Sequence, residues 1–230
     1  MFFCIVGTVV DGHSFAQDAI DRGATSLVAE RKVYLADATD VTEVVVSDSR
    51  KAMAYASANY YDNPSRAFSL VGITGTNGKT TTTYLVEHIA SVAGNRCGVI
   101  GTVGNKIAGA MEHAERTTPE SPDLQKLFAR MRDAGCTVVA MEVSSHALDL
   151  RRTWDTDFAV TAFTNLTQDH LDYHHTFDDY FEAKALLFSK DYPARRVISI
   201  DGSWGRELLR RCTAAGDEVI TTGFDVSAQI

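Results

Sequence analysis

The sequence FSLVGITGTNGKTTTT, residues Phe68–Thr83, decides the fold of this chain. An apolar run over residues 70–73 predicts a buried strand. A turn with two glycines follows at residues 75–78, and Lys79 and Thr80 then begin a segment with helical spacing. A strand, a glycine turn, a lysine, a hydroxyl and a helix, in that order, are the layout of a phosphate-binding loop. The stretch therefore predicts a site for the phosphates of a nucleotide.

The chemistry of this turn suits phosphate groups. Glycines let successive backbone N–H groups point into one concavity, and the start of the helix adds partial positive charge. Lys79 can reach the outer phosphates of a nucleotide, and the Thr80 hydroxyl can ligate magnesium. The spacing departs from the strict pattern, because Ile73 stands where its first glycine is expected and the glycines are Gly72 and Gly75 instead. The alternative is a plain glycine turn with Lys79 in solvent.

Two helices have clear sequence signals. After the turn, Leu85, Ile89 and Val92 recur at i, i+4 and i+7, which predicts a helix that ends at Gly94. Farther along the chain, Ser121 precedes a proline and an acidic residue, so it is expected to be the N-cap of another helix.

The composition excludes several classes of protein. Of the 230 residues, 45% are hydrophobic and 23% are charged, as in globular proteins. The net charge of -8 and the lack of a Lys/Arg run argue against a nucleic-acid partner. No apolar run is long enough to span a bilayer, so no membrane partner is expected. The four cysteines form no CxxC pair, which favours free thiols in a cytoplasmic protein. They are Cys4, Cys97, Cys136 and Cys212.

Two α/β domains are expected, with a boundary in the turn-rich residues 62–65. Residues 1–66 would form a small N-terminal domain, and residues 67–230 a central domain that contains the phosphate loop. Strand and helix patterns alternate, which indicates a mostly parallel sheet with right-handed crossovers. Both domains are expected to be incomplete. Strands are expected at residues 2–6, 26–29, 44–46, 96–101, 137–143, 158–163, 196–200 and 218–221, and further helices at 15–23, 47–60, 176–188 and 204–215.

Candidate metal ligands follow two of the expected strands. In an open α/β sheet, ligands bind beyond the carboxyl ends of the strands. Glu142 lies at that end of the strand over 137–143, where an acid beside a phosphate loop favours magnesium over a plain solvent position. His170 is the next metal candidate, in the polar loop after the following strand. His174 and His175 lie farther along this loop and are expected at the surface.

Each of two further features can be interpreted in two ways. Lys184 lies on an apolar helix, and its spacing favours a stem on the core with the ammonium in solvent. A buried lysine with a lowered pKa could instead react with carbon dioxide. The loop Arg116–Glu120, RTTPE, could bind an anionic substrate or form an ordinary capped turn.

Taken together, these stretches resemble the Mur ligase family, and within it the ligases that add the third amino acid to a UDP-N-acetylmuramoyl peptide. The phosphate loop is shared with folylpolyglutamate and cyanophycin synthetases. The motifs TTPES, MEVSSHAL and FTNLTQDHLDYH, in that order, are specific to third-residue ligases. His175 stands where this family commonly has glycine. The similar stretches cover nearly the whole chain: FFCIVGTVVDGHSF at 2–15, TGTNGKTTT at 74–82, TTPES at 117–121, MEVSSHAL at 141–148, FTNLTQDHLDYH at 163–174 and EAKALLF at 182–188.

The resemblance implies an ATP-dependent amide ligase of peptidoglycan precursor synthesis that acts through an acyl phosphate. Its substrates would be UDP-MurNAc-L-Ala-D-Glu and a diamino acid, either meso-diaminopimelate or L-lysine. Its cofactors would be ATP, Mg²⁺ and a carbamylated lysine. The residues implied are, for ATP, Gly75, Thr76, Asn77, Gly78, Lys79, Thr80 and Thr81; for metal, Thr80, Glu142, His170 and Lys184 as its carbamate; for substrate, Thr8, Val9, Val10, Thr117, Thr118, Ser144 and Arg152; and for catalysis, Lys79, Glu142, His170 and Lys184.

The resemblance further implies a monomer in the bacterial cytoplasm. The chain begins after a first-domain motif of the family and ends inside the central domain, so a fragment with little turnover of its own is expected. The alternatives are another ligase of the superfamily, such as a cyanophycin-synthetase-like enzyme, or an inactive fragment that only binds ATP.

Overall fold

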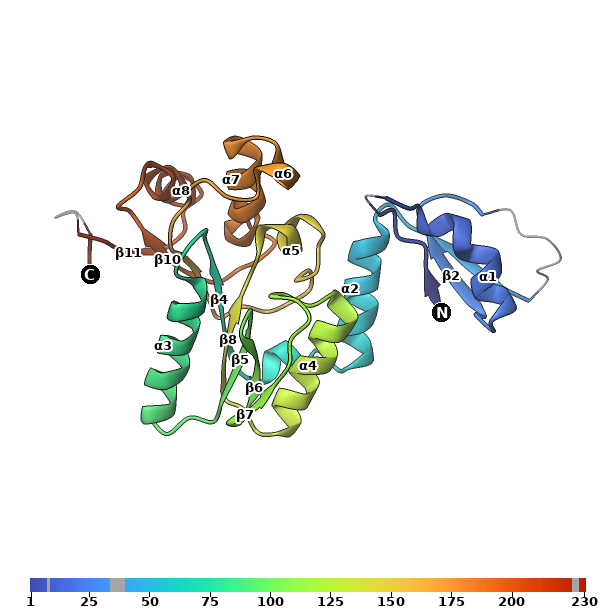
Figure 1. Ribbon diagram of the computed structural model, residues 1–230, viewed down its shortest axis with the longest axis horizontal. Coiled ribbons are helices and arrows are strands. Elements are labelled where there is room, and N and C mark those ends of the chain that lie inside the picture. The colour runs from blue at the N-terminus through green and yellow to red at the C-terminus, as the bar shows by residue number, and fades with distance from the viewer. Residues whose placement is uncertain (8, 34–39, 225–227) are drawn as a thin grey trace.

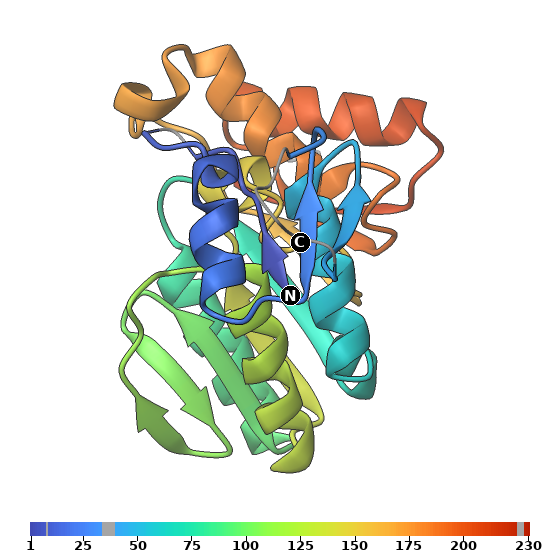
Figure 2. The same ribbon diagram turned by 90° about the vertical axis from the view of Figure 1, so that its right-hand side faces the viewer.

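The chain folds into two sheets, described here from a computed structural model (Figure 1). The structure describes residues 1–7, 9–33, 40–224 and 228–230. In these residues one sheet has three strands and the other has eight. Figure 2, viewed from the side of the three-stranded sheet, shows it as a separate layer in front of the larger one.

The small sheet is parallel, with the strand order β1-β2-β3. Its core is modest and contains Cys4, Leu27 and Ala29. The strand expected over residues 2–6 is shorter, because the backbone turns after its first residues and Val6 pairs with Asp11. The elements of this part are β1 Phe2–Phe3, η1 Gly12–Phe15, α1 Ala16–Asp21, β2 Ser26–Ala29 and β3 Thr42–Val45.

Helix α2, Ser49–Tyr60, connects the two sheets. Asp48 caps it by accepting a hydrogen bond from the Lys51 N–H at 2.9 Å. The helix packs along α4, Ser121–Asp133, and Arg132 of α4 donates a hydrogen bond to the carbonyl that follows α2, at 2.8 Å. Figure 1 shows α2 beside α4, on the side of the large sheet that faces the small one.

The large sheet has the strand order β11-β10-β9-β4-β8-β5-β6-β7. Neighbouring strands from β11 to β5 are parallel, which confirms the α/β class and the mostly parallel sheet. The hairpin β6-β7 adds an antiparallel edge that the sequence did not predict. The strands are β4 Ser69–Thr74, β5 Cys97–Gly101, β6 Gly104–Ile107, β7 Ala110–Glu112, β8 Val138–Glu142, β9 Val160–Phe163, β10 Arg195–Ser199 and β11 Val219–Thr222.

Helices cover both faces of this sheet, with α3 and α4 on opposite sides and α5, α6 and α7 gathered above its upper edge (Figure 1). In the described residues no helix is both long and apolar enough to cross a bilayer. The division into domains after residue 66 stays a prediction. The remaining helices are η2 Pro64–Ala67, α3 Lys79–Val92, α5 Ser145–Asp149, α6 Leu171–His174, α7 Phe177–Ala185, η3 Leu186–Phe188 and α8 Ser203–Ala214.

Two details of the helices differ from expectation. Helix α3 forms as predicted, but Leu85, Ile89 and Val92 face outward and Thr83 is its buried residue. The period of apolar residues identifies a helix without saying which face meets the sheet. Ser121 is the first residue of α4, and the residue before it takes the N-cap position that the sequence assigned to Ser121.

Strand β8 explains why the large sheet can hold a polar site. Its last four residues, 139–142, are all buried, because helices cover both faces. Three of them are apolar and the fourth is Glu142. A carboxylate costs free energy to bury unless partners satisfy it, so Glu142 needs polar neighbours at this edge.

Candidate nucleotide-binding site

The predicted phosphate loop connects β4 to α3 at the carboxyl edge of the large sheet. Gly75 has φ of +146° and Gly78, which caps α3, has φ of +85°, both in the range that favours glycine. A Cβ atom on Gly75 would lie 2.0 Å from Thr164 Oγ1. The turn therefore requires glycine at position 75, both for its backbone conformation and for its close approach to the segment that follows β9.

The chain after β9 braces this loop. The Thr76 N–H donates to the Asn165 carbonyl at 2.9 Å, and the Asn77 N–H donates to Asn165 Oδ1 at 3.0 Å. Thr164 Oγ1 donates to the Asn77 carbonyl at 2.7 Å. Spacing along the chain carries no signal for a contact between segments almost ninety residues apart, so the sequence did not reveal Thr164 and Asn165 as supports of the loop.

Lys79 begins α3 and folds back over the loop. Its Nζ donates to the carbonyls of Gly75 and Thr76, at 2.9 Å each. Burial lowers the pKa of Lys79, and the nearby charge of Glu142 opposes that shift. The ammonium is therefore held at the mouth of the turn, where phosphate oxygens could replace the two carbonyls.

Glu142 meets Thr80 at the first turn of α3. Glu142 Oε1 accepts hydrogen bonds from Thr80 Oγ1 and from the Thr102 N–H, both at 2.9 Å, and Oε2 accepts from Thr102 Oγ1 at 3.2 Å. Thr102, in the turn after β5, was not singled out from the sequence. These bonds satisfy the buried carboxylate and hold it beside the Thr80 hydroxyl. A hydroxyl and a carboxylate side by side are oxygen ligands of the kind that magnesium takes.

A cavity of about 390 Å³ lies over the loop. It collects residues from six separate segments of the sequence, at the edge where the strand order predicts a ligand site. Among the predicted site residues in the described part of the chain, five do not line it: Val9, Val10, Gly75, Thr118 and Arg152. The lining residues are Thr76, Asn77, Gly78, Lys79, Thr80, Thr81, Thr102, Thr117, Glu142, Ser144, Ser145, His170 and Lys184.

Lys184 is buried, with 1% of its surface exposed. Its Nζ donates to the Gly75 carbonyl at 2.9 Å and lies 4.4 Å from the centroid of the Tyr180 ring. Burial, and then the charge of Lys79, lower the pKa of Lys184 to about 7. Spacing alone predicted that the ammonium lies in solvent, and this prediction is wrong. Helix α7 directs the side chain inward, where a backbone carbonyl accepts its hydrogen bond.

Two further histidines, on α5 and α6, gather behind His170, which lines the cavity. The rings of His170 and His146 lie 5.0 Å apart between centroids, at an interplanar angle of 90°. His174 is buried and its Nε2 lies 2.9 Å from Ser145 Oγ, so the expectation of a surface position for His174 is wrong. Helix α6 turns this residue back onto α5, whereas His175 is exposed as expected. Burial lowers the pKa of both His146 and His174.

The loop before α4 forms the opposite wall. Thr117 and Ser144 line the cavity. Thr118 is buried, and its Oγ1 donates to the Glu142 carbonyl at 2.8 Å and accepts from the Ser144 N–H at 3.1 Å. Arg152 donates to the Thr118 carbonyl at 3.2 Å. Thr118 and Arg152 thus shape the wall, and their contact with substrate stays a prediction.

Three arginines meet at Glu120, which lies on the same loop but outside the lining of this cavity. Arg116 and Glu120 line a separate cavity of about 470 Å³. Arg116 and Arg152 each place a guanidinium nitrogen 2.8 Å from Glu120 Oε1, and Arg50 of α2 lies 3.9 Å from Oε2. Burial lowers the pKa of Arg152. One carboxylate offsets only one of three positive charges, so this arginine cluster suits an anionic substrate. Arg50 was missed from the sequence because it comes from a helix that precedes the loop by about seventy residues.

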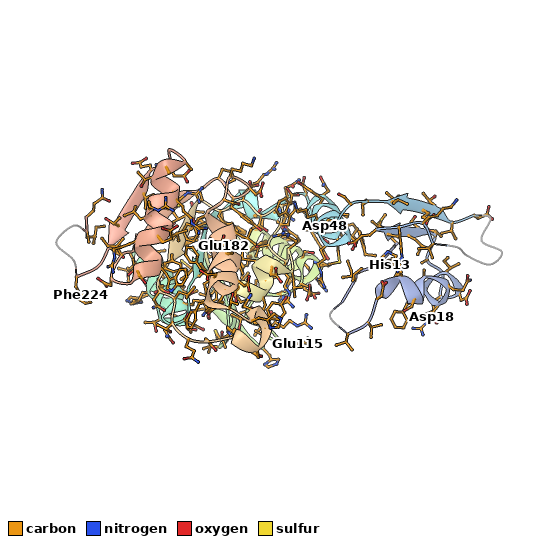
Figure 3. All side chains as sticks on the ribbon, turned by 90° about the horizontal axis from the view of Figure 1, so that it is seen from above. His13, Asp18, Asp48, Glu115, Glu182 and Phe224 are labelled. Atoms are coloured by element: carbon orange, nitrogen blue, oxygen red, sulfur yellow. The ribbon has the colours of Figure 1, made fainter. Side chains whose placement is uncertain are left out.

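Three of the residues predicted to contact substrate, Thr8, Val9 and Val10, belong to the N-terminal part of the chain. Val9 is 92% and Val10 is 50% exposed, and Thr8 lies outside the described residues. Beside them, Asp11 Oδ1 accepts a hydrogen bond from the His13 N–H at 3.0 Å and lies 2.6 Å from its Nδ1. Figure 3 shows His13 on this smaller part of the chain. The roles of Val9 and Val10 stay predictions.

The side chains present fit magnesium better than a metal held by protein alone. In the described part of the chain there is no group of three or more His, Cys, Asp or Glu side chains placed to hold a metal ion. The cavity offers instead Thr80 Oγ1 beside the Glu142 carboxylate, with His170 on the same lining. Magnesium usually keeps several waters and takes one or two protein ligands together with phosphate oxygens.

Replacing Gly75 with alanine is expected to damage both the fold and the loop. The new Cβ would overlap Thr164, and alanine is strained at this φ, so we expect a loss of about 2 kcal/mol or more in the free energy of unfolding. Gly109→Ala is the control, because Gly109 has φ of +98° but no atom within 4 Å of a built Cβ. Unfolding in urea gives the free energy of unfolding of both variants. Equal losses of stability would show that backbone strain alone, and not the contact with Thr164, makes glycine necessary at position 75.

Two family models match the chain. The one described as the Mur ligase family catalytic domain matches residues 1–73, and the one described as the Mur ligase middle domain matches residues 73–230.

Two similar proteins carry the name UDP-N-acetylmuramoyl-L-alanyl-D-glutamate--2,6-diaminopimelate ligase. The one from Clostridium botulinum is 46% identical over 231 residues, which is 100% of this chain and 47% of that protein. The one from Geobacillus thermodenitrificans is 51% identical over 190 residues, which is 83% of this chain and 38% of that protein. A solved structure of a ligase with this name aligns with a TM-score of 0.79 at 27% identity, over 94% of this chain and 44% of that one. The chain thus spans about half the length of the curated relatives it matches.

Proposed function

Because the chain belongs to the Mur ligase family, we propose that it carries the nucleotide site of an ATP-dependent ligase of peptidoglycan precursor synthesis. The proposed reaction joins 2,6-diaminopimelate to UDP-N-acetylmuramoyl-L-alanyl-D-glutamate, the substrates for which the similar proteins are named. The observation that carries this proposal is the meeting of Lys79, Thr80, Glu142, His170 and Lys184 around one cavity.

The reaction has two balanced steps. A carboxylate oxygen of the D-glutamyl residue attacks the γ-phosphorus of ATP, and the bond from that phosphorus to ADP breaks, which leaves an acyl phosphate. The amine of the diamino acid then attacks the acyl carbon, an amide bond forms, the carbon–oxygen bond to phosphate breaks and the amine loses a proton. Neither step needs an oxidant or a reductant. Catalysis would therefore rest on positioning and on neutralising phosphate charge.

The phosphate loop would hold the nucleotide in this proposal. Residues 75–81 turn the chain at the positive end of α3, a position that attracts phosphate oxygens. Lys79 would exchange the carbonyls of Gly75 and Thr76 for the outer phosphates. Its partly buried ammonium needs only a rotation of its side chain, because it already lies over the turn.

Thr80 and Glu142 would hold one magnesium ion, and His170 and a carbamylated Lys184 would hold a second. Magnesium, when bound, offsets the charge on the phosphoryl oxygens. The environment of Lys184 supports the carbamate. Carbon dioxide adds only to a neutral amine, and an amine whose pKa is about 7 is neutral in a large fraction of molecules near neutral pH.

The acceptor substrate, UDP-N-acetylmuramoyl-L-alanyl-D-glutamate, would extend from the cavity toward Glu120 and its three arginines. Thr117 and Ser144 would contact its peptide, since both line the cavity next to the phosphate loop. The acceptor carries carboxylates and a diphosphate, so the net positive charge contributed by Arg50, Arg116 and Arg152 would attract it. We also propose a cytoplasmic location, which fits the four free and buried cysteines.

The test is substrate-dependent release of ADP by the complete gene product that contains these residues. With Mg·ATP and diaminopimelate, we expect release to require UDP-MurNAc-L-Ala-D-Glu, and we expect L-lysine to replace diaminopimelate poorly. The product is identified by mass as the acceptor plus one diaminopimelate minus water. Release that requires an aspartate polymer would favour a cyanophycin-synthetase-like enzyme, and nucleotide binding without release would favour a binding protein.

A further inference from the structure

Tyr180 occupies an unusual position beneath the phosphate loop. It is fully buried on α7, one helical turn before Lys184. Its hydroxyl lies 3.2 Å from Thr76 Oγ1, and the Lys184 ammonium lies over its ring, 4.4 Å from the centroid. The ring also packs against His174, with centroids 5.1 Å apart. No sequence motif singled this residue out, and the proposed reaction does not use it.

The other hydrogen bonds of Thr76 determine which hydroxyl is the donor in its bond with Tyr180. The Thr167 N–H donates to Thr76 Oγ1 at 3.0 Å, and Thr76 Oγ1 donates its single proton to the Thr167 carbonyl at 3.2 Å. A threonine hydroxyl has one donor and two acceptor positions. The one that remains is an acceptor, so Tyr180 donates its hydroxyl proton to Thr76. This bond joins the phosphate loop to α7.

The backbone on either side of this bond carries both lysines. The Gly75 carbonyl accepts hydrogen bonds from Lys79 Nζ and from Lys184 Nζ, at 2.9 Å each, and the Thr76 carbonyl accepts from Lys79 as well. A shift of Thr76 would therefore move the acceptors of both ammonium groups. Tyr180 and Lys184 lie on the same helix, and they contact adjacent residues of the loop, Thr76 and Gly75.

We propose that Tyr180 is a positioning residue that anchors the phosphate loop to the helix bearing Lys184, and so keeps the loop in the shape that binds a nucleotide. This inference rests on the proposed function, because it assumes that the loop binds ATP and ADP. Tyr180 acts through Thr76 and not through contact with the nucleotide, since it is fully buried and does not line the cavity.

The test compares two tyrosines in similar surroundings. Tyr180→Phe removes the hydroxyl that reaches Thr76. Tyr192→Phe is the matched control, because Tyr192 is also buried and its hydroxyl lies 3.1 Å from Thr153 Oγ1, away from the loop. Calorimetric titration with ADP and magnesium chloride gives the dissociation constant, and thermal unfolding gives the stability. We expect Tyr180→Phe to raise the Kd for ADP about three- to tenfold, and Tyr192→Phe to change it less than twofold.

A mutant cycle separates the anchor from a general loss of packing. Thr76→Val removes the acceptor, so in that background Tyr180→Phe should change the Kd for ADP less than twofold. The inference is overturned if both tyrosine variants weaken ADP binding equally, if neither does, or if Tyr180→Phe keeps its full effect beside Thr76→Val. If the unaltered chain binds no ADP, the proposed function itself fails, which is a different result from normal binding that Tyr180→Phe leaves unchanged.

Discussion

Replacing Lys184 with methionine in the complete gene product is expected to lower turnover about a thousandfold, while the folded state remains as stable as before or becomes more stable. The two effects separate because Lys184 is a polar group buried in an apolar helix face. Methionine has a similar length and no charge to desolvate, so the core keeps its packing. The group that would place a metal on the transferring phosphoryl is lost, and such groups contribute several kcal/mol to catalysis.

The same lysine gives the expected pH dependence of carbamate formation. Burial and the charge of Lys79 lower its pKa to about 7, so the amine is mostly protonated at pH 6 and mostly neutral above pH 8. At a fixed partial pressure of carbon dioxide, carbamate should therefore increase with pH across this range. Carbon-13 NMR with labelled carbon dioxide measures it, and Lys184→Met should lack the signal. Full turnover by Lys184→Met would contradict the role given to this residue.

Replacing Lys79 with alanine is expected to raise the dissociation constant for Mg·ATP about a hundredfold. Hydrogen bonds between charged groups contribute about 1.5–3 kcal/mol, and the upper end of this range corresponds to a hundredfold change in the dissociation constant. The effect should be larger for ATP than for AMP, because Lys79 is expected to reach the outer phosphates. Titration calorimetry with each nucleotide measures both constants.

Lys106→Ala is the matched control for Lys79. Lys106 is also a partly buried lysine, and its Nζ lies 2.9 Å from Glu87 Oε1 on the hairpin side of α3, outside the cavity. We expect its removal to change nucleotide binding less than twofold. Equal losses in the two variants would mean that either lysine charge strengthens nucleotide binding to the same extent and that the loop lysine has no special role.

Features carried by neighbouring residues were predictable from the sequence. The strand, turn and helix around residues 68–83 could be read because the apolar run, the glycines and the Lys-Thr pair lie within one short segment. Glu142 and His170 could be placed near the loop because parallel strands end at one edge of a sheet. The structure brings both to the cavity.

Features that depend on distant contacts were not predictable. Thr102 reaches Glu142 from a turn forty residues earlier, and Arg50 reaches Glu120 from another helix. His174 was expected at the surface because its neighbours are polar, and its burial follows from the packing of α6 on α5. The burial of Lys184 has the same kind of cause, since helical spacing cannot show that the loop supplies a carbonyl for its ammonium.

The most direct test is titration of the chain with ADP and ATP, each with and without magnesium. Thr80 and Glu142 lie side by side below the loop, so magnesium should strengthen binding of one nucleotide per chain, and Glu142→Gln should remove most of that gain while the chain stays folded. Tight binding that is unaffected by magnesium, or no binding at millimolar nucleotide, would contradict the claim that these residues form a magnesium–nucleotide site.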